Sequence, residues 1–139
     1  MVFSFPYKRV LLKISGETIS GENKFGIDQE ACLKVVGAIK VLREKNIQVA
    51  LVIGGGNIFR GIQLNRLGME RTPADQMGML ATLINGIALK QAFEKQKIPA
   101  MVLSALDCPQ VVLSYTWEKT MHLIEEENVI IFVGGTGNP

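Results

Sequence analysis

Three consecutive glycines, Gly54–Gly56, directly follow an apolar run rich in β-branched side chains, 47–53. The run predicts a buried strand, and the glycines let the backbone turn sharply and approach a ligand closely because they lack a Cβ atom. Successive N–H groups in such a loop can form an anion-binding nest, to which Arg60 can add a charge-assisted contact. A phosphorylated small molecule is therefore the first ligand that this sequence predicts.

The rest of the chain alternates between apolar runs and helical patterns. Strands are predicted at 10–14, 47–53, 100–103 and 129–133, and helices at 28–46, 72–96 and 117–126. This alternation is typical of an α/β fold with a mostly parallel sheet and helices on both faces. Ligands of such sheets bind at the carboxyl ends of the strands. We therefore expect the loops at Ser15–Gly16, Gly54–Gly56 and Gly134–Asn138 to meet at one sheet edge.

The longest predicted helix, 72–96, has a start signal and an unusually wide apolar stripe. Thr72 suits the N-cap and Pro73 the first helical position. The stripe consists of Met77, Leu80, Ala81, Ile84 and Ala88, widened by Leu83 and Ile87. A stripe of this width predicts that the helix is covered on more than one side, by the sheet and by a partner subunit.

Length and composition limit the class of protein. The 139 residues fit a single α/β domain, 1–139, and a hydrophobic fraction of 47% argues against disorder. The net charge is +2 and the basic residues are scattered, so neither a nucleic-acid partner nor a membrane partner is predicted. His122 is the single histidine, which disfavours a histidine metal site or a Ser-His-Asp triad. Two distant cysteines, Cys32 and Cys108, and the lack of a signal peptide or membrane span predict reduced thiols and a cytoplasmic location.

The common nucleotide motifs are missing, and two charged residues have alternative interpretations. No segment matches a Walker A loop, and Phe59 stands where a dinucleotide fingerprint requires its third glycine. Lys13, at the end of the first strand, either neutralises a transferring phosphoryl group or simply extends to solvent. Asp75 either binds a ligand or completes a capping box that begins at Thr72.

Four ordered segments together resemble the bacterial uridylate kinases (UMP kinases), a family with the amino-acid-kinase fold. The segments are 7–17 (YKRVLLKISGE), 52–61 (VIGGGNIFRG), 75–82 (DQMGMLAT) and 134–139 (GGTGNP). The resemblance implies transfer of the γ-phosphoryl group of ATP, which carries Mg²⁺, to UMP. It also implies a homo-oligomer, typically a hexamer in that family. No resident metal site is implied.

The resemblance assigns roles to individual positions. The ATP-binding positions are Lys13, Ile14, Ser15, Gly16, Gly56 and Arg60, of which Lys13 and Arg60 are the catalytic candidates. The UMP-binding positions are Gly55, Asp75, Thr136, Gly137 and Asn138. A segment linked to activation by GTP matches Gly21, Glu22, Asn23, Lys24, Phe25 and Gly26.

Chains of the resembled family continue well beyond the position of Pro139. We therefore expect these residues to form the N-terminal, UMP-binding part, without the C-terminal ATP-binding part, and to be inactive alone. Two other functions stay open at this point. One is a different enzyme of the same fold that acts on a carbamate or a carboxylate, and the other is a non-catalytic nucleotide-binding module.

Overall fold

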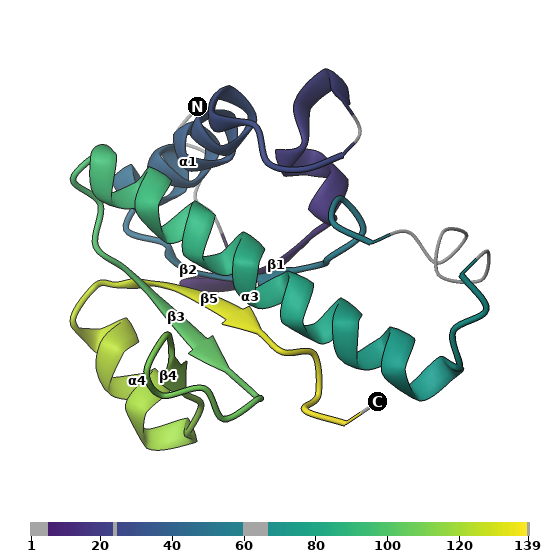
Figure 1. Ribbon diagram of the computed structural model, residues 1–139. Helices are drawn as coiled ribbons and strands as arrows, with labels where there is room; N and C mark the ends of the chain where they lie inside the picture. The colour runs from purple at the N-terminus through teal and green to yellow at the C-terminus, as the bar shows by residue number, and fades with distance from the viewer. Residues whose placement is uncertain (1–5, 24, 60–66, 139) are drawn as a thin grey trace.

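The computed structural model of this protein describes residues 6–23, 25–59 and 67–138 (Figure 1). The strands are β1 (Arg9–Ile14), β2 (Gln48–Ile53), β3 (Ala100–Ser104), β4 (Leu113–Ser114) and β5 (Val129–Val133). The helices are α1 (Gln29–Glu44), α3 (Arg71–Lys95) and α4 (Trp117–Glu125), with short 3₁₀ helices η1 (Gly16–Ile19) and η2 (Gly21–Asn23).

The described strands form one five-stranded sheet in the order β1-β2-β5-β3-β4, and every pairing is parallel. The register of the first pair runs from Arg9 opposite Gln48 to Ile14 opposite Ile53. Because all strands are parallel, their carboxyl ends lie at the same edge of the sheet. The predicted α/β class with a parallel sheet is confirmed.

Helices cover both faces of the sheet, as predicted (Figure 1). On one face α1 and α3 contribute side chains such as Val36 and Phe93 to the main core, which also contains Leu51 and Ile131 of the central strands. On the other face α4 adds Ile124 to a smaller core cluster. Alternate residues of each strand point to opposite faces, which is why both cores draw on the same strands.

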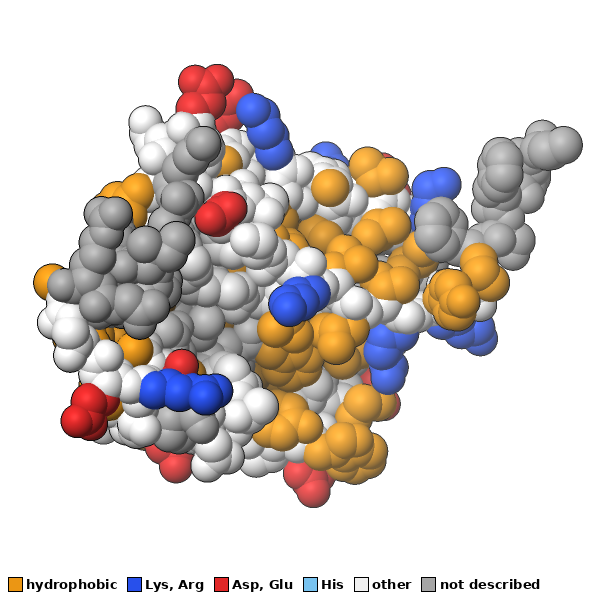
Figure 2. Space-filling model, turned by 90° about the vertical axis from the view of Figure 1, so that its right-hand side faces the viewer, with side chains coloured by type: hydrophobic (Ala, Val, Ile, Leu, Met, Phe, Trp, Pro, Cys, Tyr) orange, Lys and Arg blue, Asp and Glu red, His pale blue; other side chains and the backbone are white. Residues whose placement is uncertain are grey.

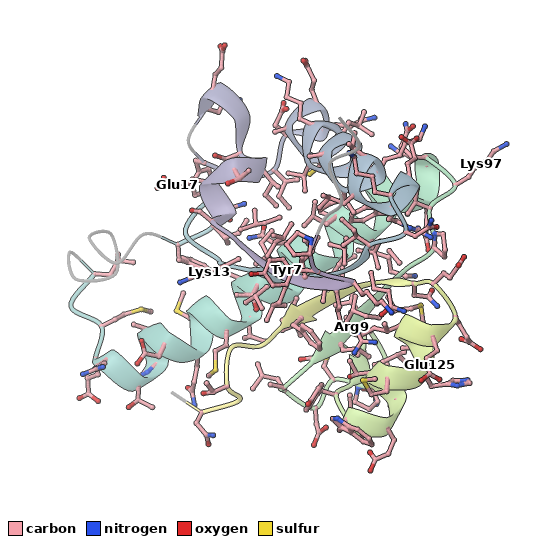
Figure 3. The ribbon with its side chains drawn as sticks, turned by 180° about the vertical axis from the view of Figure 1, so that it is seen from behind. Tyr7, Arg9, Lys13, Glu17, Lys97 and Glu125 are labelled. Atoms are coloured by element: carbon pink, nitrogen blue, oxygen red, sulfur yellow. The ribbon has the colours of Figure 1, made fainter. Side chains whose placement is uncertain are left out.

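The strand β1 lies at an edge of the described sheet and its two faces differ. Val10, Leu12 and Ile14 pack against the main core. Leu11 and Lys13 point to the other face and are exposed, Leu11 to the extent of 62%. Figure 3 shows Arg9 beside α4 and Lys13 at the opposite end of the strand. Lys13 therefore lies near the edge of the sheet from which the glycine loops leave.

The start of α3 differs from the prediction. The helix begins at Arg71 after the N-cap Glu70, which makes no side-chain capping bond. Thr72 is therefore already inside the helix, and a capping box between Thr72 and Asp75 does not form. Asp75 instead pairs with Arg71 one turn earlier, at 3.6 Å between Nε and Oδ2. By contrast, Asp28 caps the start of α1, since its Oδ1 accepts a 2.7 Å hydrogen bond from the Ala31 N–H.

The predicted apolar stripe of α3 is divided between two environments. The side of the helix that packs inward consists of small, polar and large residues: Ala81, Thr82, Leu83, Asn85, Gly86, Leu89, Ala92 and Phe93. Leu80, Ile84 and Ile87 remain 53%, 48% and 41% exposed. Of the predicted stripe, Ala81 and Leu83 pack inward, whereas Leu80, Ile84 and Ile87 lie on the exposed side of the helix. Small residues on the inner side allow a close approach to the sheet.

Large hydrophobic side chains also occur elsewhere on the surface. On the face shown in Figure 2 they form a broad cluster, with most of the charged side chains around its margin. None of the helices in residues 6–23, 25–59 and 67–138 is both long enough and apolar enough to cross a membrane.

Candidate functional site

The first two glycine-bearing loops touch at the carboxyl edge of the sheet. The backbone N–H of Gly54 donates a 2.9 Å hydrogen bond to the carbonyl of Ile14, which joins the ends of β1 and β2. Gly16 lies so close that an added Cβ atom would be 2.8 Å from the Gly54 oxygen and 2.9 Å from the Gly56 nitrogen. Since backbone atoms cannot yield at such distances, only glycine fits at position 16.

The glycine loop also lies directly against α3. A Cβ atom on Gly55 would be 2.8 Å from the Ala81 Cβ atom and 2.9 Å from the carbonyl oxygen of Gly78. The loop then turns, with the N–H groups of Ile58 and Phe59 both donating to the Gly55 carbonyl. Within the described residues, the structure gives no acceptor for the N–H groups of Gly55 and Gly56. Two backbone donors are thus available beside the helix.

The third loop reaches the same helix from the end of β5. The backbone N–H of Gly134 donates to the hydroxyl of Thr82 at 2.7 Å, and that hydroxyl donates to the Met79 carbonyl at 2.6 Å. Gly135 faces the Met79 side chain: a Cβ atom added to Gly135 would lie 3.6 Å from the Met79 Cγ. The convergence of the three loops at one sheet edge is therefore confirmed.

Between the second and third loops lies an open cleft of about 380 Å³. Its lining residues are Gly55, Gly56, Phe59, Ala74, Asp75, Gly78, Met79, Thr82, Gly135 and Asn138. Asp75 is the one carboxylate of this lining, and its side chain is 45% exposed. The cleft therefore combines available backbone N–H donors at one point with a carboxylate acceptor at another.

The first predicted phosphate loop has mainly structural contacts of its own. Ser15 caps η1, because its Oγ accepts a 3.3 Å hydrogen bond from the Glu17 N–H. The Ile14 side chain packs against the main core, and its carbonyl accepts the hydrogen bond from Gly54. Lys13 is exposed and does not line the cleft.

The remaining predicted residues are distributed around the cleft. Asn138 lines it, whereas Thr136 lines a neighbouring apolar pocket of about 350 Å³ beside Tyr115 and Phe132. The Thr136 hydroxyl hydrogen-bonds the Asn138 carbonyl at 3.2 Å. Gly137 has a positive φ of 79° and lines neither pocket.

Two predicted residues, Arg60 and Lys24, lie outside the described residues. Of the 21–26 segment, Gly21, Glu22 and Asn23 form η2 and Phe25 is 60% exposed. Gly26 contacts the glycine loop, because its N–H donates to the Asn57 carbonyl at 2.8 Å. The segment is therefore connected to the site through its last residue.

Sequence reasoning missed several residues here, above all Asn57, Asn85 and Thr82. Each is a polar residue that is at most 9% exposed. The available signal was a polar side chain directly after the glycine run and two more within the otherwise apolar stretch 77–89. Met79 also lines the cleft.

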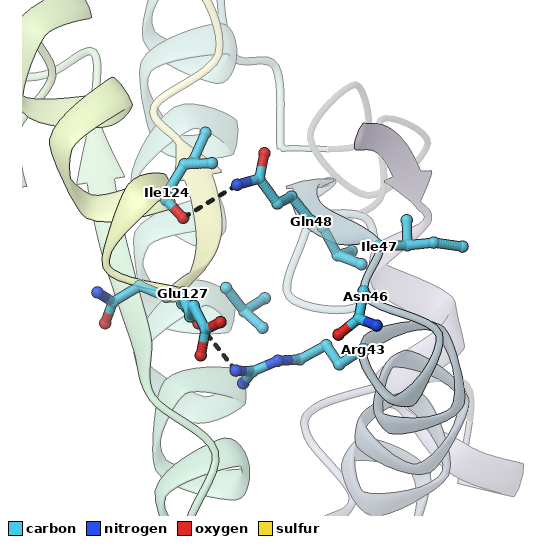
Figure 4. A pocket seen from close by; sticks show the side chains of 9 residues that line it. Arg43, Asn46, Ile47, Gln48, Ile124 and Glu127 are labelled. Carbon is cyan, nitrogen blue, oxygen red and sulfur yellow. Dashed lines mark hydrogen bonds between the residues drawn. The ribbon is translucent and has the colours of Figure 1, made fainter. Parts of the chain in front are cut away.

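The opposite, amino edge of the sheet carries a separate pocket of about 210 Å³ (Figure 4). Its polar side chains are used in structural bonds: Arg43 donates to the Glu127 carbonyl at 2.9 Å and Gln48 to the Ile124 carbonyl at 3.5 Å. None of the predicted site residues lines this pocket.

The amino acid kinase family model matches residues 8–139 of this chain. The chain belongs to the amino acid kinase family. The match extends over β1 and all three glycine-bearing loops.

Individual relatives carry more specific names. The uridylate kinase of Protochlamydia amoebophila is 57% identical over 136 residues, which are 98% of this chain and 54% of that protein. Crystal structures of UMP kinases from Ureaplasma parvum and Bacillus anthracis superpose with TM-scores of 0.90 and 0.92, at 38% and 31% identity. The matched regions cover 58% and 56% of those two UMP kinase chains, and 96% and 97% of this chain. The chain thus spans little more than half the length of these relatives.

Proposed function

We propose that this protein is a UMP kinase, which transfers the γ-phosphoryl group of ATP to UMP and yields UDP and ADP. The observation that carries the proposal is the cleft at the carboxyl edge, which pairs the Gly55 and Gly56 backbone with the Asp75 carboxylate. The similarity to uridylate kinases over nearly the whole chain supports the same assignment. Because those relatives are longer, the reaction is proposed for the protein as its gene encodes it.

UMP would occupy the cleft with its phosphate at the glycine loop. The N–H groups of Gly55 and Gly56 can donate to phosphate oxygens, as in an anion-binding nest. The Asp75 carboxylate can accept hydrogen bonds from the two ribose hydroxyls. Thr136, Gly137 and Asn138 would continue the nucleoside site from the end of β5. This arrangement favours a phosphorylated, hydroxyl-bearing acceptor over a carbamate or a small carboxylate.

ATP would approach the same edge from the side of β1. We assign its phosphates to Lys13, to the backbone of the 14–16 loop and to Gly56, with Arg60 as a further cation. Lys13 would neutralise charge on the transferring group. No cluster of three metal-binding side chains exists among the described residues. We propose that Mg²⁺ arrives with ATP, whose phosphates bind it.

Two surfaces support proposals on partners and regulation. The exposed Leu80, Ile84 and Ile87 of α3 support a homo-oligomer, in which a second copy would cover these side chains. The hexamer of the resembled family is the assembly we propose. The 21–26 segment, joined to the glycine loop through Gly26, is the proposed element through which GTP would activate the enzyme. Such an enzyme would act in cytoplasmic pyrimidine nucleotide synthesis.

Calorimetry and a coupled assay test the proposal. Titration with UMP should give saturable binding, and titration with carbamoyl phosphate or N-acetylglutamate should not. The protein as its gene encodes it should form UDP from UMP and ATP in a coupled assay. Binding of UMP without any UDP formation would support a non-catalytic nucleotide-binding protein. Binding of carbamoyl phosphate in preference to UMP would show that the acceptor has been assigned wrongly.

A further inference from the structure

Two buried asparagines form a reciprocal pair behind the glycine loop. Asn57 and Asn85 are both 0% exposed. The Nδ2 of Asn57 donates to the Oδ1 of Asn85 at 2.9 Å, and the Nδ2 of Asn85 donates to the Oδ1 of Asn57 at 2.7 Å. The pair connects the loop after β2 with the inner side of α3.

Each amide also holds a backbone carbonyl with its second N–H. Asn85 donates to the carbonyl of Gly54 at 2.7 Å, and Asn57 donates to the carbonyl of Gly26 at 2.8 Å. A Cβ atom on Gly16 would collide with the Oδ1 of Asn57. The pair is therefore in contact with three loops: 15–16, 21–26 and 54–57.

The network admits only one orientation of both amides. Turning either side chain over would place its oxygen against a carbonyl oxygen and leave two acceptors facing each other. No buried side-chain polar atom in the described residues lacks a hydrogen-bond partner. A complete buried network fixes its members in one arrangement, whereas a partly satisfied one is costly. The pair therefore fixes the direction of the Gly54 carbonyl and of the peptide units that follow it.

We propose that Asn57 and Asn85 are positioning residues, which hold the glycine loop so that the N–H groups of Gly55 and Gly56 face the phosphate of the acceptor nucleotide. The inference rests on the proposed function for the identity of the ligand. Neither side chain lines the cleft, so both act through the backbone. Asn85 does so from a helix, which is more rigid than the loop that it holds.

The sharpest variant is Asn85→Asp, measured in the protein as its gene encodes it. Aspartate keeps the size of asparagine and the acceptor for Asn57, but it presents an oxygen to the Gly54 carbonyl. We expect UMP affinity to fall by roughly tenfold or more, since a displacement of about 1 Å in a positioned group costs on this scale. The matched control is Asn128→Asp. Asn128 donates to the Leu123 carbonyl at 3.1 Å at the amino edge of the sheet, and its variant should keep full UMP affinity.

A second measurement separates positioning from simple stability and does not need UMP. In Asn85→Ala, amide hydrogen exchange at Gly54, Ile58 and Phe59, whose N–H groups are hydrogen-bonded in the loop, should rise by roughly tenfold relative to β5, because the loop opens locally. If exchange at these three amides changes no more than in Asn128→Asp, the inference is wrong even where stability falls. Unchanged UMP affinity in a folded Asn85→Asp variant would also overturn the inference. Failure of the unmodified protein to bind UMP would instead count against the proposed function, and the exchange experiment would still decide the role of the pair.

Discussion

The hydroxyl of Thr82 accepts a 2.7 Å hydrogen bond from the backbone N–H of Gly134, which ties α3 to the loop after β5. The same hydroxyl donates to the Met79 carbonyl at 2.6 Å, so it acts both as acceptor and as donor. Gly134 has a positive φ of 83°, in the left-handed region that favours glycine. One buried hydroxyl thus sets where the proposed nucleoside loop begins relative to the glycine loop.

Replacing this hydroxyl by a methyl group should loosen the connection. Thr82→Val keeps the shape of the side chain but leaves the Gly134 N–H without an acceptor, which costs about 1–3 kcal/mol of the free energy of unfolding. We expect that loss in urea denaturation, together with weaker UMP binding in calorimetry. Thr82→Ser retains the hydroxyl and serves as the control. A loss in the serine variant without one in the valine variant would show that the methyl packing matters, and not the hydrogen bond.

The strands and the site edge could be predicted because their signals are local. Buried parallel strands are continuous apolar runs, and the run at 129–133 coincides with β5. Once all strands are parallel, glycines that follow Ile14, Ile53 and Val133 must lie at one edge. The two-residue strand β4 was missed because so short a segment carries no periodic pattern.

The inner face of α3 and the asparagine pair could not be predicted in the same way. Both depend on contacts between segments far apart in the chain, such as Asn57 with Asn85. The Thr72-Pro73 signal was also misleading, because the preceding residues continue the helix back to Arg71. A local capping pattern indicates where a helix can begin, but contacts with the rest of the fold determine where it does begin.

Lys13 offers a test of the proposed phosphoryl transfer. In the protein as its gene encodes it, Lys13→Ala should lower kcat much more than it raises the KM for UMP. A contact made mainly with the transferring group acts in the transition state and therefore appears in kcat. Lys40→Ala, an exposed lysine on α1, is the control. If kcat is unchanged in Lys13→Ala, Lys13 simply extends to solvent from the end of the strand and takes no part in the transfer.

The two free cysteines should differ in reactivity. Cys32 is 2% exposed, and burial, followed by the negative charge of Asp28, raises the pKa of its thiol. Because the thiolate is the reactive form, an aromatic disulfide reagent should modify the less buried Cys108 first and Cys32 only on unfolding. The variant Cys108→Ser isolates the slow phase. Since the folded state holds the Cys32 proton more tightly than the unfolded chain, this thiol also makes stability fall as the pH rises above the ordinary cysteine pKa.

Asp75 is the most discriminating position in the cleft, because the structure removes its capping interpretation. Among the described residues its carboxylate pairs with the exposed Arg71 at 3.6 Å, an ion pair worth about 0–1 kcal/mol. Asp75→Glu and Asp75→Ala should therefore melt near the temperature of the unmodified protein. The longer glutamate would misplace the acceptor for the ribose hydroxyls, and a displacement of about 1 Å can cost on the order of a hundredfold in rate. We expect a clear loss of UMP affinity in calorimetry for both variants. Arg71→Ala, which removes the ion pair and keeps the carboxylate, should bind UMP normally. Normal UMP binding by Asp75→Glu and Asp75→Ala would remove Asp75 from the site and leave the glycine loop and Asn138 as the parts of the cleft with an assigned role.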